Sequence, residues 1–272
     1  MGMRKLSVCI PTHRDDLKLY NAISSVLDQE YPRDLIDLCI FTNGLSPSTK
    51  EHFRANRLTQ SSVAMGPSSA KNSALSMAET EYAILLDSDD MLIPSALKIY
   101  NKVLDSYPDL RVGCEFSAVN LIRRPEGFGA HFHRTEEEFG SFFFNNISRV
   151  HETGAVGRPI IFKTEGRPPF DSDYSFSEER KLAIDLWEDK TPVHIMKTCT
   201  YVYNWNEQGI TGAVAVADSP KFTEVTQRLG AMASKVEPNV VVTEPLYLVP
   251  PPERTELARW AMLEKMFDRR NQ

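Results

Sequence analysis

Short apolar runs alternate with longer amphipathic segments through the first half of the chain. The runs at 5–12, 35–44 and 82–87 are rich in Val, Ile, Leu and Cys, a composition typical of strands buried on both faces of a parallel sheet. Apolar side chains recur at helical spacing in three further segments, 15–31, 68–79 and 93–107. This alternation predicts an α/β fold in which a Rossmann-like, mostly parallel central sheet is flanked by helices.

The pattern loosens after about residue 112. Residues 110–124 look like a further strand region, whereas 125–159 are irregular and rich in aromatic residues, which indicates a packed segment with loops. Helical spacing returns at 177–189 and strand character at 192–205. A final amphipathic segment follows a run of prolines and predicts a C-terminal helix. We therefore expect the chain to divide into residues 1–112, a second half of the same domain at 113–250, and a terminal helix at 251–272.

Polar residues directly follow the three predicted strands of the first half. Pro11 and Thr12 end the first strand, Asn43 and Gly44 end the second, and the third runs into "DSDD" at 87–90. In an open α/β sheet, ligands bind beyond the carboxyl ends of the strands. We therefore expect these three strand ends to converge on one crevice.

The "DSDD" segment carries three aspartates, Asp87, Asp89 and Asp90. Carboxylates this close repel one another, and Mg²⁺ or Mn²⁺ relieves the repulsion because such cations prefer hard oxygen ligands. Side chains alternate along a strand, so Asp87 and Asp89 can point to the same side. The pattern therefore predicts a metal site. The alternative is that these acids serve only as turn and helix-capping residues.

Composition narrows the class of protein. The 272 residues are 42% apolar and 25% charged, which is ordinary for a globular domain. The net charge of −6 argues against a dedicated nucleic-acid binder, which would need a basic surface. The four cysteines form no CxxC pair, and neither a signal-peptide core nor a membrane-spanning run is present in the sequence. We therefore expect a cytoplasmic protein.

Three segments resemble, in the same order, the signatures of family 2 glycosyltransferases of the GT-A fold: "SVCIPTHR", "GPSSAKNSALSMAETEYAILLDSDDMLIPSAL" and "SEERKLAIDLWEDKTPVHI". The middle segment is the most specific. The resemblance implies a metal-dependent, inverting enzyme that moves a sugar from a nucleoside-diphosphate sugar, with UDP favoured, to a hydroxyl of a glycan or glycoconjugate. It also implies that residues 1–112 bind the nucleotide sugar and that residues 113–250 bind the acceptor and carry the catalytic base.

The resemblance implies a donor-side role for each matching position. Pro11 and Thr12 would contact the base and ribose, and Lys71 would lie near the base and diphosphate. Asp87 would lie near the ribose and Asp89 on the Mg²⁺ or Mn²⁺ that bridges the phosphates, with both aspartates as candidate metal ligands. Such a metal neutralises the departing nucleoside diphosphate. The full set of donor-side candidates is Pro11, Thr12, Arg14, Asn43, Lys71, Asp87, Ser88 and Asp89.

One donor-side position departs from the family pattern. The second strand of family members commonly ends in acidic residues, whereas this chain has Thr42, Asn43 and Gly44. The amide of Asn43 can accept a hydrogen bond from the N3–H of uracil or thymine, and it can also donate to a ring nitrogen of cytosine. The identity of the base therefore stays open, with uridine favoured only by family frequency.

Inverting transfer needs a general base beside the acceptor hydroxyl. The resemblance aligns Glu179 with this base and Glu178 with its neighbour; Asp171 and Asp173 are alternatives. The acidic pair also suits the first turn of a helix that begins after Ser177, where the helix dipole favours negative charge. The candidate acceptor-binding residues are Asp90, His151 and Trp205.

Two alternative functions and two roles of the C-terminal helix stay open. A catalytically silent GT-A module that only binds a nucleotide sugar or carbohydrate would explain the missing acids at the second strand and the unusual Glu-Glu pair. A sugar nucleotidyltransferase would share the sheet and the metal carboxylates, but it would need a glycine-rich loop that "PTHRDDLKLY" lacks. The C-terminal helix suggests a homodimer contact or weak attachment to a membrane surface.

Overall fold

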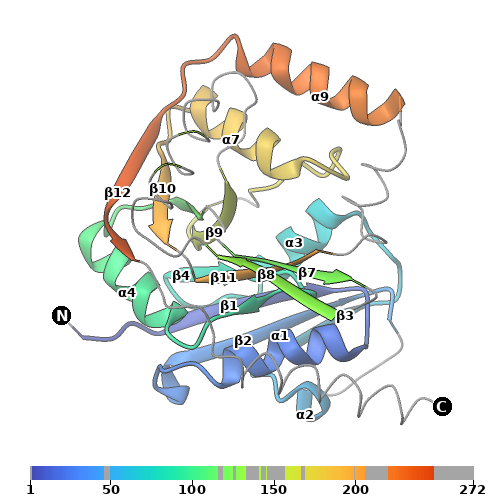
Figure 1. Ribbon diagram of the computed structural model, residues 1–272. Helices are drawn as coiled ribbons and strands as arrows, with labels where there is room; N and C mark the ends of the chain where they lie inside the picture. Colours follow the sequence, from blue (N-terminus) through green and yellow to red (C-terminus); the bar gives the residue numbers. More distant parts are fainter. Residues whose placement is uncertain are drawn as a thin grey trace.

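Figure 1 shows the computed structural model of the chain, in which strands form a central layer with helices on both sides. The structure describes residues 2–45, 50–115, 119–124, 127–132, 141, 145, 157–166, 169–198, 200–205 and 220–247. Its main sheet has eight strands in the order β12-β10-β6-β9-β4-β1-β2-β3. All neighbouring pairs are parallel except those of β9, which runs antiparallel to both β4 and β6. The predicted mostly parallel sheet is therefore confirmed.

The bounds of the main-sheet strands follow the apolar runs closely in the first half. The strands are β1 (Leu6–Thr12), β2 (Ile36–Asn43), β3 (Arg57–Ser61), β4 (Tyr82–Leu85), β6 (Val112–Glu115), β9 (Arg158–Lys163), β10 (Val193–Thr198) and β12 (Val240–Tyr247). Every residue of β2 and β4 is buried, as expected for strands covered on both faces. Gly44 turns the chain after β2 with a φ of +71°, a left-handed conformation that favours glycine.

Helices cover both faces of this sheet. One apolar core joins its first face to α1 (Leu17–Leu27) and α4 (Ala96–Ser106), and a second core joins the other face to α3 (Pro67–Leu75), α7 (Glu178–Glu188) and α9 (Pro220–Ala233). Asp16 caps α1, because its carboxylate accepts hydrogen bonds from the backbone N–H groups of Lys18 and Leu19. Two short helices, η1 (Arg33–Leu35) and α2 (Lys50–Phe53), complete the set in the described residues.

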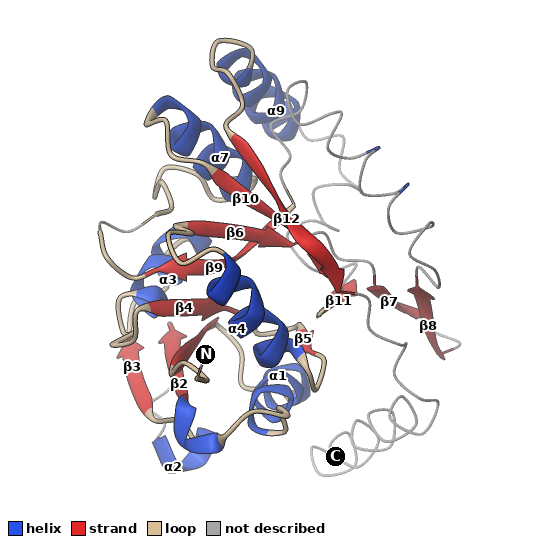
Figure 2. Cartoon of the chain, turned by 90° about the vertical axis from the view of Figure 1, so that its left-hand side faces the viewer, coloured by secondary structure: helices blue, strands red, loops and turns tan. Residues whose placement is uncertain are grey.

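A smaller sheet has the strand order β5-β11-β7-β8 (Figure 2). It contains β5 (Met91–Leu92), β7 (Val119–Arg124), β8 (Gly127–Phe132) and β11 (Tyr201–Trp205). Strand β5 begins one residue after Asp90 and pairs with β11. This pairing ties the "DSDD" segment to a strand more than a hundred residues further along the chain.

The structure differs from the sequence expectation at three places. The segment expected to be strand-like at 192–205 splits into β10 and β11, which belong to different sheets. The stretch 125–159 was expected to be irregular, yet it contains β8 and the start of β9. The exposed strand β3 was not expected, because it has few apolar residues.

The predicted C-terminal helix at 251–272 lies outside the described residues. In the described part, no helix has both the length and the apolar composition needed to cross a bilayer.

Candidate functional site

The "DSDD" segment forms a tight turn at the carboxyl end of β4. The backbone N–H of Asp90 donates to the carbonyl of Asp87 at 3.1 Å, and β5 begins directly afterwards. Because β5 is held by β11, Asp90 is carried inward and its side chain is only 1% exposed, whereas the side chain of Asp89 is 26% exposed. Ser88 between them is buried. The three aspartates therefore have different surroundings: Asp90 is enclosed, whereas the side chains of Asp87 and Asp89 are part-exposed, at 24% and 26%.

Lys71 joins this turn to the beginning of α7. Its Nζ atom donates to Oε1 of Glu178 at 2.9 Å and to Oε1 of Glu179 at 2.8 Å, and it lies 3.8 Å from Oδ1 of Asp87. The ammonium group also lies 5.4 Å from the centre of the Phe170 ring. Lys71 is buried. The structure thus brings together one lysine and three acids that the sequence had marked separately, on α3, α7 and the turn after β4.

Arg158 contributes a second cation that the sequence analysis missed. Its Nη1 atom donates to Oδ2 of Asp87 and, at 3.1 Å, to Oδ2 of Asp90. The guanidinium carbon lies 4.5 Å from the centre of the Tyr201 ring and 5.2 Å from that of Tyr203, distances typical of cation–π contacts. In the sequence, Arg158 could have been noticed as a charged residue at the start of the apolar run "RPIIF".

Burial and neighbouring charges act in opposite directions on the acids of this cluster. Burial raises the pKa of Glu179 and of Asp87, but the charges of Lys71 and Arg158 outweigh it and hold both below their ordinary values. Burial raises the pKa of Glu178, only partly opposed by Lys71. Glu179 is therefore the stronger acid of the pair, and it is ionised at neutral pH.

Asp90 behaves differently from Asp87 although both contact Arg158. Burial is the main cause that raises its pKa to about 7; Arg158 opposes this, while the charges of Asp89 and Asp87 add to it. The hydroxyl of Tyr201 donates to the same carboxylate. Asp90 is thus enclosed by protein groups. Its predicted contact with an acceptor stays a prediction.

The first two strand ends are held by local hydrogen bonds. Thr12 Oγ1 donates to the carbonyl of Arg14 at 2.8 Å, and the Arg14 guanidinium lies 3.6 Å from Oδ2 of Asp89. The amide of Asn43 donates to and accepts from the backbone of Met65, both at 2.8 Å. These contacts let Asn43 position the loop before α3, and its predicted contact with a nucleobase stays a prediction. Pro11 is half-buried in β1 beside Phe41.

Other candidates lie elsewhere or outside the described residues. Asp171 lies 3.5 Å from Nζ of Lys181 and does not join the cluster around Lys71, and Asp173 is exposed. His151 and the side chain of Trp205 lie outside the described residues. Their predicted roles in acceptor binding stay predictions.

A buried carboxylate next to the site anchors β11. Oε1 of Glu115, on β6, accepts hydrogen bonds from the backbone N–H groups of Thr200 at 2.7 Å and Tyr201 at 3.0 Å. Its Oε2 accepts from the hydroxyls of Thr200 and, at 3.2 Å, Tyr100. These bonds fix the strand that carries the tyrosine rings under Arg158. The sequence offered no signal for this role.

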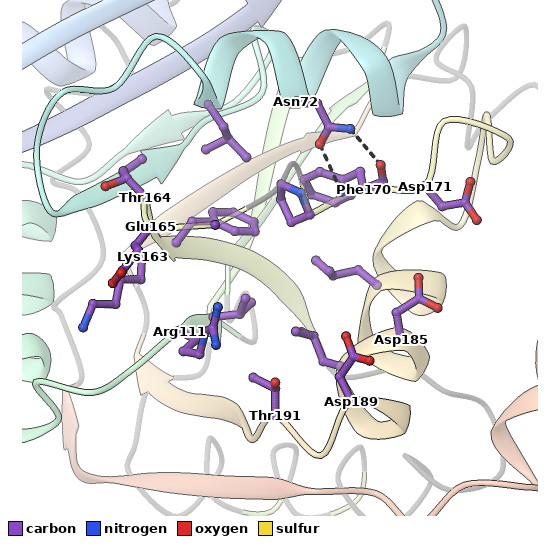
Figure 3. Close-up of a pocket in the computed structure, with 18 of the residues that line it drawn as sticks. Asn72, Arg111, Lys163, Thr164, Glu165, Phe170, Asp171, Asp185, Asp189 and Thr191 are labelled. Atoms are coloured by element: carbon purple, nitrogen blue, oxygen red, sulfur yellow. Dashed lines mark hydrogen bonds between the residues drawn. The ribbon is translucent and has the colours of Figure 1, made fainter.

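A cavity of about 780 Å³ lies between α3, α7 and the end of β9 (Figure 3). Asn72 on α3 exchanges two hydrogen bonds with the backbone of Phe170, at 2.7 and 3.0 Å. Asp185 of α7, Asp189 directly after this helix, and Arg111 also line the cavity. None of the aspartates of the "DSDD" turn lines it. Phe170, which lines the cavity, also contacts the ammonium group of Lys71.

The donor set fits a metal ion that is held mainly by a bound ligand. In the described residues, no group of three His, Cys, Asp or Glu side chains is arranged to bind a metal by itself. Asp89 offers a partly exposed carboxylate, whereas the oxygens of Asp87 face Arg158 and Lys71. Mg²⁺ is typically bound by one or two carboxylates together with phosphate oxygens and water. Asp89 is therefore the residue that would hold the ion.

Comparison with known sequences decides the family. The family model described as glycosyl transferase family 2 matches residues 7–163, more than half of the chain. The chain belongs to glycosyl transferase family 2. The match includes β1, Lys71, the "DSDD" turn and Arg158, and ends before Glu178 and Glu179.

Two curated relatives are glycosyltransferases by name. The poly(ribitol-phosphate) beta-N-acetylglucosaminyltransferase TarP of Staphylococcus aureus is 34% identical over 41% of this family 2 chain and 36% of its own length. The abequosyltransferase RfbV of Salmonella typhimurium is 28% identical over 63% of this chain and 56% of its own length. The chain thus spans between about a third and just over half of the length of these relatives.

A solved structure supports the fold of the family 2 chain. The structure of residues 1–349 of S. aureus TarS in complex with UDP-GlcNAc has a TM-score of 0.57 and 17% sequence identity, covering 97% of this chain and 71% of that one. At this identity, the likeness shows the fold. The expected GT-A architecture is therefore confirmed for the described residues, with a mostly parallel sheet between two layers of helices.

Proposed function

We propose that this chain is a glycosyltransferase that moves a sugar from a nucleoside-diphosphate sugar to a hydroxyl group of a glycan or glycoconjugate. One observation carries the proposal. Lys71, Asp87, Asp89, Arg158, Glu178 and Glu179 come from four places in the sequence and meet at the carboxyl edge of the main sheet, where α/β proteins bind their ligands. The names of two relatives support a glycoconjugate acceptor: the poly(ribitol-phosphate) transferase TarP and a GalNAc(5)-diNAcBac-PP-undecaprenol beta-1,3-glucosyltransferase of Campylobacter jejuni.

The donor side would be held by the residues around the "DSDD" turn. Asp89 would bind Mg²⁺ or Mn²⁺ together with the diphosphate, and Asp87 would face the ribose. The ion would stabilise the negative charge that develops on the departing nucleoside diphosphate. Lys71 lies close enough to this turn for its ammonium group to approach the same phosphates. The structures of TarS in complex with UDP and with UDP-GlcNAc support uridine as the base.

Glu179 would take the proton of the acceptor hydroxyl and so support inversion at the anomeric carbon. It is ionised, and its side chain is 28% exposed, compared with 9% for Glu178. A base needs access to the acceptor as well as a suitable pKa, so Glu179 is favoured over its neighbour. Lys71 pairs with Glu179 in this structure, and a phosphate that attracted Lys71 would leave the carboxylate freer to act as a base.

Calorimetric titration with UDP, GDP, dTDP and CDP, each with and without Mn²⁺, tests the donor site. We expect one nucleotide to bind at micromolar affinity and only with metal, and Asp89→Ala to abolish the metal-dependent part. The exposed Asp34, replaced by Asn, is the matched control that should leave binding unchanged. Failure of all four nucleotides to bind, with or without metal, would refute the proposal.

A further inference from the structure

Arg158 reaches the carboxyl edge of the sheet because β9 runs against the other strands. Strand β9 pairs with β4 in the register Ile84 to Ile161, and continuing this register by three residues places Arg158 opposite Asp87. A parallel strand at this position would have started at the other edge of the sheet. The antiparallel direction of β9 thus places the guanidinium group of Arg158 on the donor side of the site, next to the "DSDD" turn.

The contacts of Arg158 use the shape of a guanidinium group. One nitrogen bridges the carboxylates of Asp87 and Asp90, while the planar group lies over the rings of Tyr201 and Tyr203. Lysine, as a compact point charge, cannot make both carboxylate bonds and both ring contacts at once. Arg158 is therefore held on several sides and can in turn hold the Asp87 carboxylate in one orientation.

Lys71 does not provide the same restraint. It is 3.8 Å from Asp87, beyond hydrogen-bond distance, and its short bonds go to Glu178 and Glu179. In the described residues, Arg158 is the group that makes a hydrogen bond to the Asp87 side chain. The orientation of this carboxylate thus depends on Arg158.

We propose that Arg158 is a positioning residue for the nucleotide, which fixes the Asp87 carboxylate for contact with the ribose and anchors the "DSDD" turn to β11. This inference rests on the proposed function, because it assumes that Asp87 faces a bound nucleoside diphosphate. Arg158 acts through Asp87 and does not itself touch the metal. Its loss should therefore weaken nucleotide binding while the effect of metal on binding, which depends on Asp89, is retained.

The test is calorimetric binding of UDP to Arg158→Met and Arg158→Lys, with and without Mn²⁺. We expect the Kd in Mn²⁺ to rise about tenfold or more for Met and by a smaller factor for Lys. The ratio of the Kd values without and with Mn²⁺ should stay as in the wild type for both variants. Lys163→Met, a cation at the other end of the same strand, is the matched control and should leave Kd unchanged.

A double-mutant cycle separates positioning from a general structural effect. Asp87→Asn should weaken UDP binding, and adding Arg158→Met to it should cost at most about a further twofold, because both changes remove the same oriented carboxylate. Additive losses, an unchanged Kd in Arg158→Met, or loss of the metal effect would each overturn the inference. If Arg158→Met does not fold, the same cycle is run with Arg158→Lys. Absence of UDP binding by the wild type would instead refute the proposed uridine donor site.

Discussion

Asp90 should make the folded state less stable as the pH rises toward neutrality. Its carboxyl is buried beside Asp87 and Asp89, and burial is the main cause that raises its pKa to about 7. An aspartate in the unfolded chain has a pKa of about 3.9. The folded protein therefore holds this proton more tightly, and the stability that the protonated group contributes is lost as pH rises from about 4 through about 7. The variant Asp90→Asn cannot ionise and should lack this loss.

The size of the effect follows from the two pKa values. One pH unit between them corresponds to about 1.4 kcal/mol of free energy of unfolding. Between pH 5 and pH 8 this shift removes somewhat more than 2 kcal/mol; the pKa of about 7 already includes the effect of Arg158 and Tyr201 on the ionised form. We expect Asp90→Asn to gain about 2 kcal/mol relative to the wild type over this range.

Urea denaturation at pH 5, 6, 7 and 8, with EDTA present to exclude metal ions, measures the change. The difference in free energy of unfolding between Asp90→Asn and the wild type at any one pH is not decisive, because the amide also changes hydrogen bonds. The change of this difference with pH is decisive. The exposed Asp34, replaced by Asn, serves as the control and should run parallel to the wild type. A constant difference between Asp90→Asn and the wild type from pH 5 to pH 8 would show that Asp90 is ionised throughout and would refute the raised pKa.

Three further variants test the site and its support. Lys71→Met should lower the free energy of unfolding at pH 7 by about 3–5 kcal/mol, because buried acids lose their cation; a wild-type denaturation curve would contradict this. Glu179→Gln should keep nucleotide binding but reduce sugar transfer about 100-fold, and a near-normal rate would exclude it as the base. Glu115→Gln should lose about 1–3 kcal/mol by denaturation, since an amide N–H would replace the oxygen that accepts from the hydroxyls of Thr200 and Tyr100; unchanged stability would refute that role.

Local patterns predicted the elements that carry the donor side. The fully buried strands β2 and β4 could be recognised as continuous apolar runs, and α7 could be recognised as a helix that begins with two acids. The edge strand β3 could not be recognised in the sequence. Only one face of an edge strand needs apolar residues, and the sequence of β3 is mostly polar. The split of 192–205 into two strands was also hidden, since strand propensity does not specify the sheet that a strand joins.

The sequence by itself determined where the chemistry lies along the chain. Apolar periodicity marks strands and helices because burial must repeat with the geometry of each element, so the acids that follow β4 and open α7 could be located without coordinates. Only the tertiary structure decided which of these groups meet. The contact of Lys71 with Glu179 spans 108 residues, and Arg158 reaches Asp87 only because β9 is reversed. Such contacts arise from sheet order and strand direction, which depend on packing over the whole fold and leave no local periodicity in the sequence.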